Sequence, residues 1–374
     1  MKKYIYADNA ATTQLDSDAF EAMKPYLLEE YGNASQPYSF ARMGKKALRE
    51  ARSIIANCIN AKPSEIYFTS GGTESDNWAI KGSSLLNIDK DIVTSQIEHH
   101  AILNSTKFLE KMGANVIYLK PNSDGIITKD ELKKHITDKT GLISIMYGNN
   151  EIGTIQPIKE LAKIAQDYNV LFHTDAVQAV GHVNIDVVEL GIDMLSASAH
   201  KFNGPKGIGF LYLRDGVKIN SYIDGGAQEN FLRAGTENIA SIVGMAHALN
   251  KNHSLLEENK KYISDLEDEL ISILKNAQID FVRNGGKNTL PGVISLSFKN
   301  QNGEAILHRL DLKGISVSTG SACDSENTRI SHVLESIRLD HQYAKGTIRI
   351  SLGKGNTLEE VRRIANEIIK IVKC

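Results

Sequence analysis

Residues 170–213 decide the fold; they read "VLFHTDAVQAVGHVNIDVVELGIDMLSASAHKFNGPKGIGFLYL". Three short apolar runs stand in this stretch, at 170–176, 194–200 and 208–213. Short runs of this kind, bounded by polar residues and glycine, are typical of β-strands. The first two runs end in side chains that can carry chemistry. Because ligands bind beyond the carboxyl ends of strands in open parallel sheets, the stretch predicts a fold and also a place for a site.

Short apolar runs alternate with helical patterns toward the N-terminus as well. We expect strands at 65–70, 91–96, 115–120 and 141–148, and helices at 73–86, 99–113 and 158–169. Strands that alternate with helices in this way indicate an α/β domain whose sheet is mostly parallel.

The pattern changes near residue 256. A long charged helix, two shorter segments and a C-terminal helix follow, at 259–277, 292–298, 303–314 and 357–373. They are typical of a smaller α+β domain. A chain of 374 residues is too long for one hydrophobic core. We therefore predict a large domain at 15–255 and a small domain built from 1–14 and 256–374.

Composition excludes several classes of protein. The net charge is -2 and no long basic run occurs, which argues against nucleic acid or an anionic membrane as a direct partner. No stretch reaches the roughly 18 apolar residues of a membrane span, and "MKKYIYADNAATT" lacks the apolar part of a secretory signal. The three cysteines, Cys58, Cys323 and Cys374, are far apart and lack metal-site spacing. We expect a cytoplasmic protein, with Cys58 in the core and Cys374 incidental.

A glycine-containing turn, "TSGGTES" at 69–75, follows one predicted strand and opens a helix. Gly71 and Gly72 would let the backbone approach an anion, and the helix N-terminus would offer free N–H groups. The turn matches neither of the common nucleotide-binding loops. Two interpretations stay open: a phosphate cradle, or a simple capping turn with Thr73 as N-cap and Asp76 near the third helical position.

Asp175 and His99 lie at the ends of two other predicted strands. The Asp175 carboxylate could cap a helix or could face a cationic ring nitrogen, with Gln178 one helical turn away. His99 is either an ordinary core or surface histidine or a group that stacks on a ligand or transfers a proton. Because adjacent histidines point in different directions and no cysteine or carboxylate spacing supports them, we expect no metal site.

The segment "SASAHKFNGPKGIG", at 196–209, ends a strand in Ser198, His200 and Lys201. A lysine is usually a solvated surface charge. A partly desolvated lysine has a lowered pKa and can form a Schiff base with a carbonyl group. An anion cradle, a lysine, an aspartate and a histidine at strand ends suit pyridoxal 5'-phosphate, whose phosphate, aldehyde and ring nitrogen need such partners.

Nine motifs occur in order along the chain: "YADNAATT", "TSGGTESDN", "EHHA", "GNNEIG", "HTDAVQA", "SASAHKFNGPKGIG", "RAGTEN", "STGSAC" and "TIRISLG". Together they resemble the NifS/IscS-like cysteine desulfurases, which are fold-type I (aspartate aminotransferase-like) pyridoxal phosphate enzymes. The resemblance spans about residue 4 to about residue 370. It implies a homodimer with a large domain around a mostly parallel sheet and a smaller α+β domain.

The resemblance also implies a role for each matching residue. Lys201 is similar to the Schiff-base lysine that takes the substrate Cα proton, Asp175 to the pyridinium partner, Gln178 to the contact of the ring hydroxyl, and His99 to the histidine stacked on the ring. The implied phosphate contacts are Gly72, Thr73, Ser198 and His200, with Thr236 lent by the other subunit. Asn150 and Arg349 resemble the pair that holds the substrate carboxylate, a task that suits a planar guanidinium.

The resemblance gives a reason for the lone cysteine among small polar residues at 316–331. Cys323 is similar to the cysteine that attacks the substrate sulfur as a thiolate and keeps it as a persulfide, while L-cysteine becomes L-alanine. A sulfur that must visit a pocket and then an acceptor needs a loop of small residues. This segment departs from the family pattern, since Asp324 adjoins the cysteine and Glu326 follows. Nearby carboxylates disfavour a thiolate, and we expect Arg329 to offset part of this effect.

Other functions stay open on the sequence. A selenocysteine lyase or a cystine C–S lyase would use the same scaffold. An aminotransferase would share Lys201 and Asp175 but would have no use for Cys323. A non-catalytic binding protein would be expected to have lost one of these three residues. The sequence does not name the sulfur acceptor: an iron–sulfur scaffold, a tRNA-thiolation protein and a carrier for cofactor biosynthesis stay open.

Overall fold

The computed structural model describes residues 4–319 and 330–373. Its largest sheet has seven strands in the order β2-β8-β7-β6-β5-β3-β4. Their bounds are β2 (Ile66–Thr69), β3 (Asp91–Ser95), β4 (Val116–Leu119), β5 (Thr140–Ser144), β6 (Leu171–Asp175), β7 (Met194–Ser198) and β8 (Gly209–Leu213). The pairs from β7 to β4 are parallel, whereas β8 is antiparallel to β7 and β2. The α/β fold with a mostly parallel sheet is thus confirmed.

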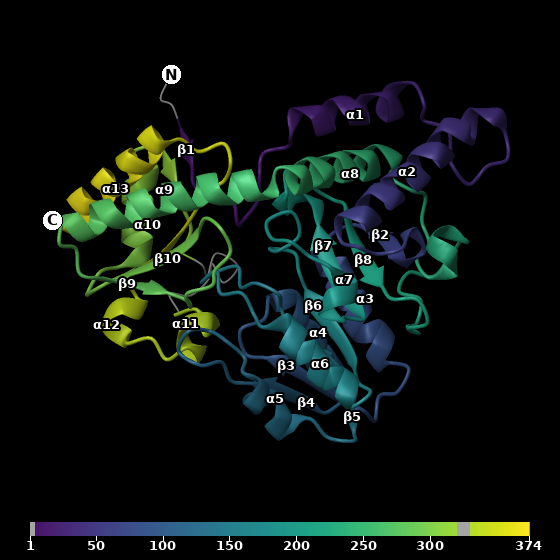
Figure 1. The fold of residues 1–374 in the computed structure, drawn as a ribbon, viewed down its shortest axis with the longest axis horizontal. Helices are drawn as coiled ribbons and strands as arrows, with labels where there is room; N and C mark the ends of the chain where they lie inside the picture. The colour runs from purple at the N-terminus through teal and green to yellow at the C-terminus, as the bar shows by residue number, and fades with distance from the viewer. Residues whose placement is uncertain (1–3, 320–329, 374) are drawn as a thin grey trace.

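Helices bury both faces of this sheet, so its strands are buried over most of their length. Successive residues of one strand enter different cores: Leu195 packs with one cluster and Met194 with the other, as a period of two requires. Helices α3 (Gly72–Ser84) and α4 (His100–Lys111) cover one face. The other is covered by α2 (Arg42–Cys58), α5 (Lys129–His135), α6 (Ile158–Asp167) and α8 (Ile239–Ser254). Short α7 (Val187–Leu190) also packs there, and α1 (Ser17–Leu28) lies along α8 (Figure 1).

A second group of elements has its own core. It contains an antiparallel sheet of β9 (Phe281–Asn284), β10 (Val293–Phe298) and β12 (Thr347–Ser351), and a parallel pair of β1 (Ile5–Tyr6) with β11 (Ile315–Ser316). Its helices are α9 (Leu256–Asn276), α10 (Gly303–Asp311), α11 (His332–Ser336), α12 (His341–Ala344) and α13 (Leu358–Val372). Long α9 leads from α8 across this group (Figure 1). This separate core includes Ile5 with Ile294 and Ile364. The domain limits at residues 14/15 and 255/256 stay a prediction.

Residues 7–16 connect the two groups of elements. The segment leaves β1, which pairs with β11 near the other end of the chain, and reaches α1. Its Asp8 forms an isolated bridge with Ser351, and its Thr13 N–H donates to the carbonyl of His200 at 2.9 Å. Both groups of elements therefore hold this segment. Within the described residues, no helix combines the length and the apolar character that crossing a membrane requires.

Candidate active site

A cavity of about 570 Å³ opens at the carboxyl ends of the parallel strands. The predicted site residues that line it are Gly72, Thr73, His99, Asn150, Asp175, Gln178, Ser198, His200, Lys201 and Arg349. Among described residues, Thr236 does not line this cavity, and its side chain is exposed. Cys323 lies outside the described residues. The structure therefore gathers most of the predicted site in one place, with Thr236 apart from it.

The turn before α3 differs from the simple capping interpretation. The helix begins at Gly72, so the N-cap is Gly71 (φ 151°), which has no side chain to form a cap, and not Thr73. The Ser70 N–H donates to the Glu74 carboxylate at 2.8 Å, so Glu74 takes the role expected of Asp76. A Cβ atom at position 72 would lie 2.4 Å from a methyl group of Val177, so only glycine fits there. The first turn of α3 therefore presents backbone N–H groups at the cavity, as an anion site needs.

Lys201 is held at both its backbone and its amine. It follows β7 in a short 3-10 turn, Ala199–Lys201. Its Nζ donates to the carbonyl oxygens of Ala10 at 2.6 Å and Ala11 at 2.9 Å. Its own carbonyl lies 2.9 Å from Nε2 of His182. The N-terminal segment thus supplies the acceptors that place the lysine amine inside the cavity.

Two buried carboxyl groups share the cavity wall. Asp175 is 5% exposed and Asp76 is 1% exposed, and each offers an oxygen within 4.8 Å of the other and of a His99 nitrogen. Burial raises the pKa of Asp175, which His99 and Lys201 oppose. Burial, reinforced by Asp175, raises the pKa of Asp76 well above its ordinary value. Because two close carboxylates resist ionising together, each makes it harder for the other to lose its proton.

Two histidines of the site are neutral near pH 7. His99 is the N-cap of α4, and its Nδ1 accepts the N–H of Ala101 at 3.2 Å, so Nε2 carries the proton. Burial lowers the pKa of His99, an effect that Asp175 opposes and that Lys201 and His100 reinforce. Burial, together with Lys201 and Lys206, lowers the pKa of His200 to about 4. A neutral imidazole can stack on a ring or donate one hydrogen bond without adding charge.

Arg349 projects from β12 and is 5% exposed. Its guanidinium donates to Oδ1 of Asp8 at 2.7 Å and to the backbone carbonyl of Asn150 at 2.9 Å. Its Nε is buried and has no hydrogen-bond partner among the described residues. A guanidinium held in this way retains a donor for a bound anion. The structure shows that Asn150 contributes its backbone carbonyl to this arrangement.

Several contributors to the site were not predicted from the sequence. They are Asp8, the carbonyls of Ala10 and Ala11, the buried carboxyl of Asp76, and Glu98. Glu98 accepts the Ser95 hydroxyl at 2.5 Å and the Met146 N–H at 3.0 Å. Burial raises the pKa of Glu98 from 4.5 to about 8, with Asp175 adding to the effect. The available signal was their place inside the quoted motifs, which contain all five residues.

We expect Glu98→Gln to change how stability depends on pH. Between about pH 4.5 and 8 the folded protein keeps a proton on Glu98 that the unfolded chain releases, so the parent loses stability as pH rises. The glutamine variant lacks this loss. Its free energy of unfolding relative to the parent should therefore rise with pH, by at most about 1.4 kcal/mol per pH unit. Urea unfolding of both proteins across this range measures the difference.

The matched control is Glu189→Gln, at an exposed carboxylate that pairs with Lys159. Its measured difference from the parent over the same pH range gives the baseline for the comparison. A difference for Glu98→Gln that changes with pH no more than this baseline would show that Glu98 is ionised in the folded protein.

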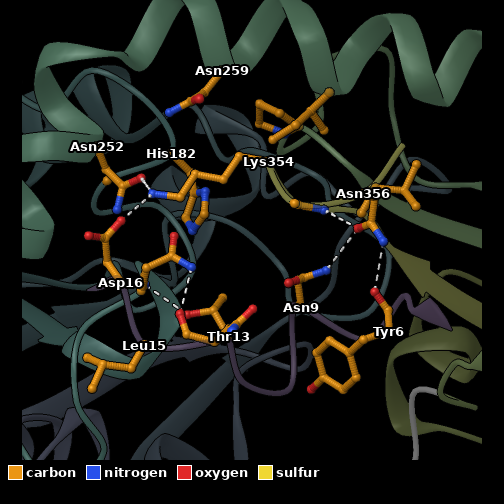
Figure 2. Close-up of a pocket in the computed structure, with 18 of the residues that line it drawn as sticks. Tyr6, Asn9, Thr13, Leu15, Asp16, His182, Asn252, Asn259, Lys354 and Asn356 are labelled. Atoms are coloured by element: carbon orange, nitrogen blue, oxygen red, sulfur yellow. Dashed lines mark hydrogen bonds and ion pairs between the residues drawn. The ribbon is translucent and has the colours of Figure 1, made fainter. Parts of the chain in front are cut away.

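A second cavity, of about 440 Å³, is lined by other residues of the segment 7–16 (Figure 2). Asn9, Thr13 and Asp16 of that segment line it, and Lys354 reaches across it to Asn252 at 3.2 Å. Burial lowers the pKa of Lys354, which Asp16 opposes. Ala10 and Ala11 line the first cavity from the same segment. A single stretch of backbone thus forms a wall between the two cavities.

The first cavity fits pyridoxal phosphate on its own geometry. Position 72 has room for no side chain, which leaves the backbone open to a phosphate. An oxygen of Asp76 is buried without a hydrogen-bond partner among the described residues. The lining offers an amine, a carboxyl group and a neutral imidazole, which are the partners that the aldehyde, ring nitrogen and ring face require.

Known proteins match nearly the whole of this chain. A family described as "Aminotransferase class-V" matches residues 5–364. The protein named "Cysteine desulfurase IscS" from Dictyoglomus turgidum is 48% identical over 376 residues, which cover 100% of this chain and 95% of that protein. Its namesake from Methanosarcina thermophila is 47% identical over 373 residues, with 99% and 92% covered.

Solved structures also match this chain over most of its length. A structure titled "NIFS-LIKE PROTEIN" matches with a TM-score of 0.93 and 38% identity, over 99% of this chain and 100% of that one. A structure titled "SspA in complex with cysteine" matches with a TM-score of 0.85 and 36% identity, over 94% of this chain and 100% of that one.

Proposed function

The chain belongs to the class-V aminotransferase family, and we propose that the 570 Å³ cavity is where it acts as a cysteine desulfurase. The enzyme depends on pyridoxal phosphate and takes the sulfur of L-cysteine, leaving L-alanine. One observation carries the proposal for the cavity. Lys201, Asp175 and Arg349 come from three separate parts of the chain, and all three line the same cavity. An amine, a buried carboxyl group and a guanidinium in one cavity suit an amino-acid substrate and this cofactor.

The cofactor would occupy the floor of the cavity. When bound, pyridoxal phosphate condenses with an amino group and withdraws electrons from the carbon atom next to it. Asp175 would hold a proton at the ring nitrogen, His99 would cover the ring face, and Gln178 would contact the ring hydroxyl. The phosphate would be bound by Gly72, Thr73, Ser198 and His200.

Lys201 is the residue that we propose to move protons at the substrate. Its amine donates to two backbone carbonyls of the N-terminal segment, which keep it in the cavity while it is not engaged. When the Lys201 amine is unprotonated, it can take the proton from the substrate Cα and return a proton later. Neutral His99 adds no competing positive charge beside it.

Arg349 would bind the substrate carboxylate, together with Asn150. We expect Arg349→Lys to lower kcat/KM for L-cysteine by about 100-fold, mostly through a higher KM, because lysine lacks the planar pair of donors. The measurement is steady-state kinetics with L-cysteine and with cysteamine, which has no carboxylate. The loss should be confined to L-cysteine.

Arg214→Lys is the matched control for that experiment, since Arg214 pairs with Asp193 away from the cavity. It should leave both substrates unaffected. An equal loss with L-cysteine and cysteamine for Arg349→Lys would mean that this arginine supports the fold and does not read the carboxylate.

Cys323 is proposed as the first sulfur acceptor. Its thiolate would attack the substrate sulfur and form an S–S bond while the substrate C–S bond breaks. The electron pair of the broken bond stays with the carbon skeleton, which takes up a proton and becomes alanine. The persulfide then passes to an acceptor, for which an iron–sulfur scaffold, a tRNA-thiolation protein and a cofactor-biosynthesis carrier stay open.

We also propose a homodimer. Helices α1 and α2 and the turn between them expose large apolar side chains, among them Phe20, Leu28, Tyr31 and Phe40. Large exposed apolar groups gathered on one side of a protein are typical of a contact surface. The exposed position of Thr236 supports a role in the cavity of a second copy, where it would contact the phosphate.

The test of the function is alanine release from L-cysteine, with excess thiol reductant, for the parent and for Cys323→Ala. Alanine from the parent alone supports desulfuration with Cys323 as the acceptor. Equal release from both proteins would contradict that role and favour a lyase. The relative rates on L-cysteine, L-selenocysteine and L-cystine distinguish the desulfurase from the two lyases on the same scaffold.

A further inference from the structure

Three consecutive residues shortly before Thr236 have left-handed backbone conformations. The φ angles of Glu229, Asn230 and Phe231 are 45°, 57° and 66°. Asparagine adopts this region readily, whereas glutamate does so less often and a bulky phenylalanine rarely. Such conformations persist only where the surroundings hold them, and they gather at functional sites. Other residues must therefore hold the backbone of this run in place, and the run is a candidate for a functional role.

The restraint is an ion pair whose carboxylate is buried and whose arginine is half-buried. Both oxygens of the Glu229 carboxylate accept from the guanidinium of Arg52, at 2.6 and 2.8 Å, and one of them also accepts the N–H of Phe68 at 3.0 Å. The Glu229 side chain is 4% exposed. The Arg52 guanidinium lies 4.3 Å from the centre of the Phe68 ring. Residues of helix α2 and strand β2 thus hold the side chain of Glu229, the first residue of the strained run.

A second ion pair holds the far side of the run. Arg233 donates to both oxygens of Glu74, at 2.8 and 3.1 Å, in the first turn of α3. Burial alone would raise the pKa of Glu74, but the bonds from Arg233 and Ser70 hold it below its ordinary value. The Gly235 N–H also donates to the side-chain oxygen of Gln228 at 3.2 Å. The chain is therefore fixed on both sides of the run and leaves Thr236 exposed just beyond.

Buried ion pairs are poor evidence for a role in stability alone. Removing two charges from water costs about as much as their attraction returns, so well-packed apolar residues often serve equally well. Among described residues, neither Arg52 nor Glu229 lines the catalytic cavity. Both residues line a separate cavity of about 650 Å³, and their ion pair also fixes the first residue of the strained run. Through that run they can act on the position of Thr236.

We propose that Arg52 and Glu229 are positioning residues that aim Thr236 at the cofactor phosphate of a second copy of this chain. The inference rests on the proposed homodimer and on the proposed role of Thr236. Each subunit then completes the phosphate site of its partner, and the accuracy of that contact depends on an ion pair in the subunit that lends the threonine. A mutation at Glu229 acts on the partner's cavity and spares the cavity of its own chain.

Mixed dimers, in which the two chains carry different purification tags and different mutations, test this prediction. One chain carries Lys201→Ala and is the silenced chain, because it lacks the lysine that reacts with pyridoxal phosphate. Only the chain that keeps Lys201 forms the imine absorbance band with pyridoxal phosphate, so titration of the apoprotein reports the Kd of that site. With Glu229→Ala on the silenced chain, the intact site borrows a misplaced Thr236, and its Kd should rise about tenfold, the loss of roughly one hydrogen bond to a charged group. With Glu229→Ala on the chain that keeps Lys201, Kd should stay within about twofold.

Control variants keep the test decisive. Glu189→Ala, at an exposed ion pair, should leave Kd unchanged in both arrangements. Glu229→Gln keeps an acceptor for the Phe68 N–H and should show a smaller rise than Glu229→Ala. It replaces Glu229→Ala if sedimentation shows that the alanine variant does not assemble.

Thr236→Ala separates this inference from the proposed function. A rise in Kd for Thr236→Ala on the silenced chain, without one for Glu229→Ala, leaves the shared site standing and overturns the inference. No rise for Thr236→Ala on the silenced chain overturns the shared site and the inference together. Equal rises for Glu229→Ala in both arrangements would show that the ion pair merely supports its own fold, which also overturns the inference.

Discussion

Lys201→Ala should lower kcat/KM for L-cysteine by about 10,000-fold, the upper range of what one positioned acid–base group contributes. The same change should remove the imine absorbance band that pyridoxal phosphate forms with the parent. The physical reason is that the Lys201 amine is placed in the cavity by the carbonyls of Ala10 and Ala11, and alanine offers no group that accepts or returns a proton there. Absorbance spectra and alanine release measure both effects.

Lys206→Ala is the matched control, because Lys206 lines the same cavity and its side chain is exposed. It should keep the absorbance band and most of the activity. If the absorbance band survived in Lys201→Ala and disappeared in Lys206→Ala, the reactive amine would belong to Lys206 and our assignment of Lys201 would be wrong.

Asp175→Asn should lower kcat by about 1,000-fold, a loss typical of removing one preorganised electrostatic contact. Asp175 is buried in a cavity where water cannot replace its charge. An amide cannot hold a proton at the ring nitrogen as a carboxylate does, so the electron withdrawal by the ring weakens. The measurement is kcat at saturating L-cysteine, together with the pH dependence of the imine absorbance.

Asp76→Asn tests which of the two neighbouring carboxyl groups is ionised. If Asp175 is the ionised member of the pair, Asp76 carries the proton, and an amide there replaces a neutral acid with little effect on kcat. Loss of activity in Asp76→Asn with little loss in Asp175→Asn would reverse the two roles.

Much of the site could be predicted because its members follow strands directly. Asp175, Lys201 and His99 each stand at or just beyond a strand end, so local sequence brings them to one edge of the sheet. The alternative interpretation that made Thr73 the N-cap of α3 was wrong, because the N-cap lies two residues earlier, at Gly71. A hydroxyl residue is the usual N-cap, but the close approach of Ser198 and Val177 to the turn favours glycine at 71 and 72.

The rest could not be read from local pattern. The acceptors of the Lys201 amine are backbone carbonyls about 190 positions earlier, and a backbone carbonyl has no sequence signature. Asp8 meets Arg349 across 341 positions. The burial of Asp76 and Glu98 depends on how helices and strands pack together, since either residue type is usually exposed. Thr236 and Cys323 stay predictions, the latter outside the described residues.

The parallel pairing of β1 with β11 has a consequence for how the chain folds during synthesis. Ile5 faces Ile315, so the first strand has no partner until most of the polypeptide has left the ribosome. The large domain needs only earlier residues and can fold first, since domains generally fold as units from the N-terminus. Contacts this distant in sequence form late. The N-terminal segment that contains Ala10 and Ala11 would then pack into place last, after Lys201 is already positioned.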